Sequence, residues 1–308
     1  MTNKAKGLVV LLVAVMVLGL SQFALADDIT IGASLLTQQH PFYVQLKQAM
    51  EKAADDNGVE LIVSIANQDL NKQISDVEDF IVRGVDAIVL SPVDSKGVVG
   101  AIIKAKRAGI PVITVDISAE GVEVDAHVAT DNYYGGRIAG ETMAKVLNGK
   151  GQVAIIDYPV VQSVRDRVAG FKEAVSKYPG IEIVAIQPGI TRPEALNTAQ
   201  NILQAHPEVD GIFGFGDDAA LASVVAVKSA GMEDDVKVIG FDGMEEARNA
   251  VKKEESFVAV VCQYPGEMGR LGLETALRVI KGEKVEKEIP VLPGLFTKEG
   301  EQKKVVLD

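Results

Sequence analysis

The 308-residue chain has few of the residue types on which disulfide and metal sites are built. It contains one cysteine, three histidines and no tryptophan. The single cysteine, Cys262, cannot form an internal disulfide, and within the apolar run 257–262 it is expected to be a small buried hydrophobe. His40, His127 and His206 are too scattered to show the spacing of metal ligands. The composition therefore predicts neither a disulfide framework nor a bound metal.

Signatures of catalysis are also absent from the sequence. There is no G-x-S-x-G motif, no P-loop and no Ser/His/Asp set in a sensible order. The run 214–219 fits G-x-G-x-x-A, but two acids stand where a pyrophosphate would bind. We therefore expect a binding protein without a cofactor, not an enzyme. A glycosidase using Asp116 and Asp242 is the enzymatic alternative, although nothing in the sequence supplies the raised pKa that its general acid would need.

Positive charge and membrane-spanning segments are likewise scarce. The chain has 31 Lys and Arg against 43 Asp and Glu, a formal charge of −12, so we expect no nucleic-acid partner. At the N-terminus, Lys4 and Lys6 precede the apolar run 8–20, and Ala24-Leu25-Ala26 forms a small-x-small cleavage site. This pattern predicts a signal peptide over residues 1–26, removed after Ala26. Export without disulfides suits a bacterial periplasm.

The chain is rich in Val/Ile strands that alternate with amphipathic helices. Strands are expected at 29–34, 59–65, 87–90, 111–116, 152–157, 181–186, 211–215, 237–241 and 256–263, and a short strand or a crossover at 126–131. Helices are expected at 41–57, 71–83, 95–108, 132–147, 163–177, 193–205, 219–230, 244–253 and 266–281. This alternation predicts an α/β fold with parallel sheets covered on both faces. Since the last helix follows two complete runs, the chain is expected to cross back between two discontinuous domains.

The two halves of the chain repeat one pattern. The segments 111–116 and 237–242 are both apolar strands that end in an acid, and 85–88 (Val-Asp-Ala-Ile) parallels 209–212 (Val-Asp-Gly-Ile). Asp116 or Asp242 alone could cap a helix. As a repeated pair, they indicate two similar lobes that place one acid each across a cleft.

Candidate ligand-binding residues follow from the rule that ligands of open α/β sheets bind beyond the carboxyl ends of the strands. The residues chosen there are His40, Phe42, Tyr43, Ser91, Asp116, Arg165, Thr191, Gly216, Asp242 and Gln263. Asp94, Arg167, Arg192, Asp217 and Asp218 follow the same strands. Carboxylates accept from hydroxyls, Arg donates to oxygens and aromatic faces cover C–H surfaces, so the set predicts a neutral polyhydroxylated ligand. Three of these residues have an alternative role that does not involve a ligand. His40 could lie in a solvated loop, Arg165 could form a surface ion pair, and one of the two aromatics could belong to the core.

Taken together, these motifs resemble the periplasmic sugar-binding proteins of the ribose-binding type, which capture the substrate of bacterial ABC sugar importers. The resemblance covers essentially the whole chain after residue 26. It is carried by Pro41-Phe42-Tyr43, Val112-Ile113-Thr114-Val115-Asp116, Asp131-Asn132 with Gly135-Gly136, Arg165-Asp166-Arg167 with Gly170-Phe171, Gly240-Phe241-Asp242-Gly243, and Gln263.

The resemblance implies two Rossmann-like lobes joined by a three-segment hinge, the type I periplasmic binding protein fold. It implies an N-terminal lobe of residues 27–129 plus 264–291 and a C-terminal lobe of 130–263 plus 292–308, with hinges near 129–131, 263–265 and 290–293. The sugar contacts that it implies are Phe42, Tyr43, Asp116, Arg165, Asp242 and Gln263. It also implies a monomer that delivers its ligand to an ABC transporter permease, with a chemoreceptor as an optional second partner.

The chain departs from the ribose pattern at five positions. Ribose-binding members usually have Asn at the positions of His40, Ser91 and Gly216. They have an aromatic at Thr191 and an Arg at Ile117, and apolar Ile117 cannot replace a guanidinium fork. We therefore expect a small neutral sugar (a pentose or hexose) or a polyol in the interlobe cleft, without specifying ribose. The alternative is a sensor of a signalling furanosyl compound, of the autoinducer type, on the same fold.

Overall fold

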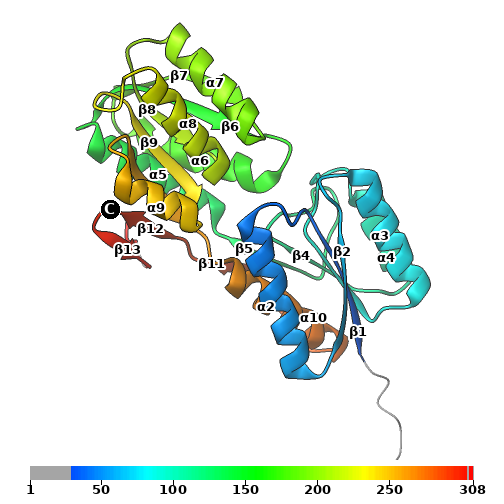
Figure 1. Ribbon diagram of the computed structural model, residues 1–308. Coiled ribbons are helices and arrows are strands. Elements are labelled where there is room, and N and C mark those ends of the chain that lie inside the picture. The colour runs from blue at the N-terminus through cyan, green and yellow to red at the C-terminus, as the bar shows by residue number, and fades with distance from the viewer. Residues whose placement is uncertain (1–28, 304, 308) are drawn as a thin grey trace, which may run out of the picture.

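The structure of the chain is a computed structural model that describes residues 29–303 and 305–307, so the signal peptide predicted over residues 1–26 lies outside the described residues. It forms two lobes, each built on one sheet (Figure 1). The strands are β1 (Thr30–Leu35), β2 (Glu60–Ile65), β3 (Ala87–Leu90), β4 (Val112–Val115), β5 (Ala126–Thr130), β6 (Lys150–Asp157), β7 (Gly180–Pro188), β8 (Val209–Gly214), β9 (Lys237–Asp242), β10 (Phe257–Cys262), β11 (Glu288–Val291), β12 (Gly294–Thr297) and β13 (Gly300–Gln302).

The helices connect these strands and cover the sheets on both faces. They are α2 (Pro41–Asn57), α3 (Leu70–Arg83), α4 (Val99–Arg107), α5 (Asn132–Val146), α6 (Gln162–Ser176), α7 (Arg192–Ala205), α8 (Asp217–Ser229), α9 (Glu245–Lys253) and α10 (Pro265–Ile280). Each strand and helix predicted between residues 29 and 281 is present, with small shifts at its ends. None of the described helices is both long enough and apolar enough to span a bilayer.

The first lobe contains a six-stranded sheet in the order β11-β5-β4-β3-β1-β2, with every neighbouring pair parallel. Helices α2 and α10 pack together on one face, and α3 and α4 pack on the other. Alternate residues of one strand serve the two faces: Ala87 and Val89 belong to the core under α2 and α10, whereas Ile88 and Leu90 belong to the core under α3 and α4. The near-continuous apolar strands seen in the sequence are therefore strands buried on both faces.

The second lobe contains a seven-stranded sheet in the order β13-β12-β10-β9-β8-β6-β7. Strands β6 to β10 run parallel, while β12 and β13 add an antiparallel edge. Helices α5 and α6 cover one face, and α7, α8 and α9 cover the other. The predicted α/β fold with two mostly parallel sheets is confirmed. The chain passes between the sheets after β5, after β10 and after β11, so α10 returns to the first lobe as the sequence predicted.

Close contact between α5 and α6 depends on glycines. A Cβ added to Gly136 would lie 2.0 Å from the carbonyl oxygen of Arg167, and one added to Gly170 would lie 2.1 Å from that of Tyr133. These distances allow no side chain, and the backbones themselves form the contact. The packing fixes the first turns of α6 beside the start of α5, which positions Arg167.

Replacing Gly136 by alanine is therefore expected to lower the free energy of unfolding by about 2 kcal/mol, a typical cost of overpacking. Alanine has the better helix propensity, so the loss would come from displacement of α6. Urea unfolding measures it. Gly100→Ala on α4 is the control, because a Cβ there meets nothing within 4 Å and should not destabilise the protein. Equal stability of the two variants would contradict the close-packing argument.

Candidate functional site

A cavity of about 150 Å³ lies between the lobes, where the carboxyl ends of both sheets meet. This volume is smaller than that of drug-sized sites, so the cavity suits a small molecule. Seven of the ten residues predicted from the sequence line it: His40, Phe42, Tyr43, Asp116, Gly216, Asp242 and Gln263. Three do not line it: Ser91, Arg165 and Thr191.

The two strand-terminal acids share an uncommon backbone conformation. Asp116 has φ 65° and Asp242 has φ 93°, although residues with a Cβ seldom adopt positive φ. Both carboxylates are buried, and both line the cavity. Strained backbone of this kind persists where the surrounding structure holds it in place, and it often occurs at ligand sites. The repeat found in the sequence is therefore also a repeat of local geometry.

Asp242 is the centre of a buried hydrogen-bond network. Its Oδ1 accepts from Arg167 Nη1 at 3.1 Å and from Gln263 Nε2 at 2.6 Å. Its Oδ2 accepts from the backbone N–H of Asp217 at 3.3 Å. A Cβ at Gly216 would lie 3.0 Å from that Oδ2, so the small residue lets the backbone approach the carboxylate closely.

Arg167 is itself held from several sides. Its Nε donates to Asn132 Oδ1 at 2.8 Å, and its Nη1 donates to the Phe215 carbonyl at 2.8 Å. The guanidinium carbon lies 3.9 Å from the centre of the Phe241 ring, a cation–π contact. The side chain is therefore fixed before any ligand arrives.

Gln263 offers an acceptor that the protein does not satisfy. Among the described residues, its buried Oε1 has no hydrogen-bond partner, while its Nε2 is bound to Asp242. An unpaired buried acceptor costs about 1–3 kcal/mol. A hydroxyl donor entering the cavity would remove that cost.

Asp116 is linked to Tyr43, whose hydroxyl donates to Oδ2 at 2.6 Å. Burial raises the pKa of Asp116 from its ordinary 3.8 to about 6, against the lowering effects of Tyr43 and Arg167. The nearby charge of Asp242 raises it further. Burial, followed by the charge of Asp116, also raises the pKa of Tyr43 well above 10. The charge of Asp242 thus acts on Asp116 across the cavity.

This raised pKa predicts a stability that depends on pH. Between about pH 4 and 6 the folded protein binds more protons than the unfolded chain, so its stability falls as the pH rises through that window. Asp116→Asn removes the buried charge, keeps an acceptor for Tyr43 and tolerates positive φ. The ligand-free variant is expected to be more stable than the parent by about 2 kcal/mol at pH 7, with the gain vanishing towards pH 4. Urea unfolding at both pH values tests this, and a variant less stable at pH 7 would contradict it.

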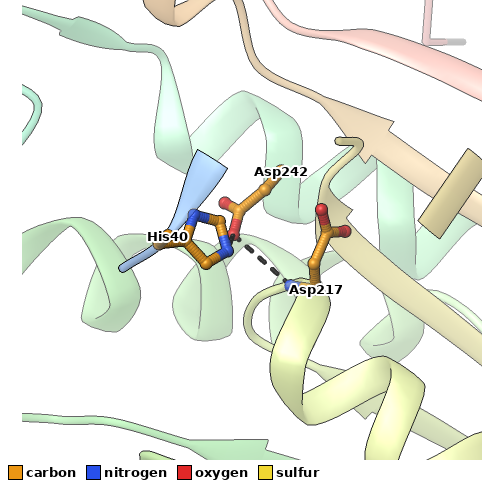
Figure 2. Close-up of side chains that lie close together, drawn as sticks. All are labelled: His40, Asp217 and Asp242. Carbon is orange, nitrogen blue, oxygen red and sulfur yellow. Dashed lines mark hydrogen bonds and ion pairs between the residues drawn. The ribbon is translucent and has the colours of Figure 1, made fainter. Parts of the chain in front are cut away.

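His40, Asp217 and Asp242 meet at one side of the cavity (Figure 2). Their nearest potential ligand atoms lie within 4.8 Å of one another, so the trio is a candidate metal site. However, His40 Nδ1 accepts from the backbone N–H of Phe42 at 3.3 Å, which places the proton of a neutral ring on Nε2. That Nε2 faces Asp242 Oδ2 at 3.9 Å. The trio is therefore arranged to donate a hydrogen bond from His40, whereas a metal would require its Nε2 deprotonated.

Asp217 has backbone partners of its own. Its carboxylate accepts from the N–H of Met244 at 2.7 Å and of Gly243 at 3.2 Å. Burial, followed by the charge of Asp242, raises its pKa well above 3.8. Metal binding would displace these bonds, so Asp217 is better suited to fixing the turn after β9.

The three predicted residues outside the cavity have other contacts. Arg165 forms an ion pair with Glu120 of the other lobe, 2.6 Å between Nη2 and Oε2. Ser91 is buried beside the Tyr43 hydroxyl, whose pKa it lowers. Thr191 is the N-cap of α7 and forms a capping box with Glu194. Of the two arginines that follow β6, Arg167 lines the cavity and Arg165 does not.

Several lining residues were missed when the candidates were chosen. Arg167 had a signal, because it shares a helical face with Val164 and Phe171, both apolar and buried. Ile117 also had one, because it stands where ribose-binding members have an Arg. The apolar lining residues Leu36 and Val161 had none, since their approach depends on how the lobes meet.

Comparison with known proteins identifies the family of the chain. The chain matches the family described as periplasmic binding protein domain over residues 31–284. It is 38% identical over 270 residues to the ribose import binding protein of Escherichia coli (strain K12), covering 87% of this chain and 90% of that one. It is 32% identical over 258 residues to a xylitol-binding protein of Mycolicibacterium smegmatis, covering 82% and 73%. A solved solute-binding protein of an ABC transporter from Actinobacillus succinogenes, with bound D-allose, superimposes with a TM-score of 0.83 at 31% identity, covering 88% of this chain and 98% of that one.

Proposed function

Because the chain belongs to the periplasmic binding protein family, we propose that it captures a small neutral sugar or polyol between its lobes and delivers it to the permease of an ABC importer. The family match confirms the predicted class, a substrate-binding transport protein and not an enzyme, which removes the glycosidase alternative. The relatives named above bind ribose, xylitol or D-allose, and none of them supports the signalling-compound alternative.

One observation carries the ligand class: Asp242, Arg167 and Gln263 form a buried, fixed network with an unpaired acceptor at the cavity. The carboxylates of Asp116 and Asp242 and the Gln263 Oε1 accept from ligand hydroxyls, while Arg167 donates. Such bonds to charged groups contribute about 1.5–3 kcal/mol each. Four of them at the upper end of this range contribute about 12 kcal/mol, and association costs of about 4 kcal/mol leave the ~8 kcal/mol of micromolar binding.

The remaining proposed contacts surround this network. His40 donates through Nε2 beside Asp242, and Phe42 and Tyr43 cover one side of the cavity. Gly216 leaves room next to the Asp242 carboxylate. We do not assign ligand contacts to Ser91, Arg165 or Thr191, which lie elsewhere.

Binding is proposed to proceed by lobe closure. The proposed lobes are residues 27–129 plus 264–291 and 130–263 plus 292–308, hinged near 129–131, 263–265 and 290–293. Contacts that join them include the Glu120–Arg165 ion pair and a 3.1 Å bond from the Gln162 N–H to Ser95 Oγ. A ligand held by Asp116 and Asp242 together stabilises the closed arrangement, because only that arrangement brings both acids onto one molecule.

The cellular setting follows the family. The family match implies a periplasmic location. We propose that the chain is exported with a signal peptide cleaved after Ala26, acts as a monomer and docks on an ABC permease, with a chemoreceptor as a second partner.

Isothermal titration of the exported chain, residues 27–308, against pentoses, hexoses and polyols tests the function. We expect saturable heat and a dissociation constant in the micromolar range with at least one of them. Mass spectrometry of small molecules released on denaturation identifies a ligand retained during purification. No heat with any compound, together with no released sugar or polyol, would refute the proposal.

A further inference from the structure

One wall of the cavity is apolar and is built by both lobes. Leu36 and Ile117 of the first lobe pack into one cluster with Val161, Val164 and Phe215 of the second, and all five line the cavity. Ile117, Val161 and Val164 are each less than 5% exposed. Since each lobe supplies part of it, the wall exists only because the lobes meet.

This apolar wall adjoins the polar groups of the cavity, since the carbonyl of Phe215 accepts from Arg167. Ile117 directly follows Asp116, whose carboxylate is bound to Tyr43. The side chains of the wall carry no donor or acceptor, so a hydroxyl pressed against them would lose its bond to water and gain nothing. A methyl or methylene group at the same place would instead be removed from water favourably.

We propose that the ligand has a hydroxyl-free carbon where it meets Leu36, Ile117, Val161 and Val164, which makes it a deoxy sugar or a deoxy polyol. The proposal rests on the proposed function and narrows its ligand class. Hydroxyls at one end of the ligand bind Asp116, Asp242, Arg167 and Gln263, and the deoxygenated end lies against the wall. The competing role for the wall, a contact that only closes the lobes, predicts no preference for deoxy compounds.

Titration with matched pairs tests the inference, because each pair differs in one hydroxyl. Suitable pairs are D-galactose and 6-deoxy-D-galactose, L-mannose and L-rhamnose, and D-ribose and 5-deoxy-D-ribose. In at least one pair the deoxy member is expected to bind about tenfold more tightly or better, the discrimination that one group in an apolar pocket provides. If every pair that binds favours the hydroxylated member, or neither member, the inference is overturned while the proposed function stands.

A substitution in the wall tests its contribution to the ligand preference separately from that of the polar residues. Ile117→Thr keeps the β-branch, shortens the side chain by one carbon and introduces a hydroxyl into the wall, and it is expected to reduce the deoxy preference several-fold. Val225→Thr makes the comparable change on α8, where the side chain is half exposed, and should leave the preference unchanged. An unchanged preference in Ile117→Thr would contradict the role of the wall.

Mass spectrometry of the molecule released from the purified protein decides the case in which no pair binds. A deoxy compound supports the inference, and a fully hydroxylated sugar or polyol overturns it but leaves the function standing. Release of neither, with no binding in the wider panel, refutes the proposed function and the inference with it.

Discussion

Replacing Asp242 by asparagine is expected to weaken ligand binding at least about a hundredfold. The change replaces the charged carboxylate that accepts hydrogen bonds from Arg167 and Gln263 and that faces His40. It leaves a guanidinium buried without its counterion, and the bonds that a ligand hydroxyl makes to a charged oxygen become bonds to a neutral one. A loss of about 3 kcal/mol follows from one or two charge-assisted bonds, which corresponds to this factor.

Asparagine is chosen because it isolates the charge. It keeps the shape of the side chain and tolerates the positive φ of this position better than alanine. Asp234→Asn makes the same change on an exposed loop of the same lobe and should bind as the parent does. Titration with the tightest compound of the panel measures both, and circular dichroism checks the fold. Binding within threefold of the parent by a folded Asp242→Asn protein would contradict the central role of this acid.

The fold could be predicted from the sequence because its strands are buried on both faces. Such strands appear as apolar runs in the sequence, as in 87–90 and 237–241. Each run is followed by a helix, and a glycine or a turn marks the end of that helix. The return of α10 to the first lobe was predictable from its place after two complete runs. The repeat of strand-terminal acids located Asp116 and Asp242 without any knowledge of the sheets.

What the sequence could not give depends on contacts between lobes and on local backbone geometry. The positive φ of Asp116 and Asp242 had no signal, because no glycine marks either position. Neither the hydrogen bond from Phe42 to His40 nor the unpaired oxygen of Gln263 could be deduced from residue types. The same holds for the apolar wall, since Leu36 and Ile117 meet Val161 only in three dimensions.

The sequence reasoning placed Arg165 among the ligand-binding candidates, whereas the structure brings Arg167 to the cavity. Both follow the same strand, but residues two apart on a helix project in different directions. Arg167 lies towards α5 and the cavity, whereas Arg165 lies towards Glu120 at the edge of the cleft. The two side chains therefore differ in burial and in the carboxylate that each leaves without a partner when it is removed. This difference makes them a matched pair for experiment.

Arg167→Ala is expected to lower the free energy of unfolding of the ligand-free protein by about 3 kcal/mol, because it leaves Asp242 buried without its cation. Arg165→Ala should cost less than about 1 kcal/mol, since its ion pair with Glu120 is about 30% exposed on both sides. Urea unfolding at pH 7 compares them directly. Arg167→Lys should recover only part of the loss, as lysine keeps the charge but cannot reach Asn132, Phe215 and Asp242 at once. Equal costs for the two alanine variants, or a larger one for Arg165, would contradict the role of Arg167 as the buried counterion of Asp242.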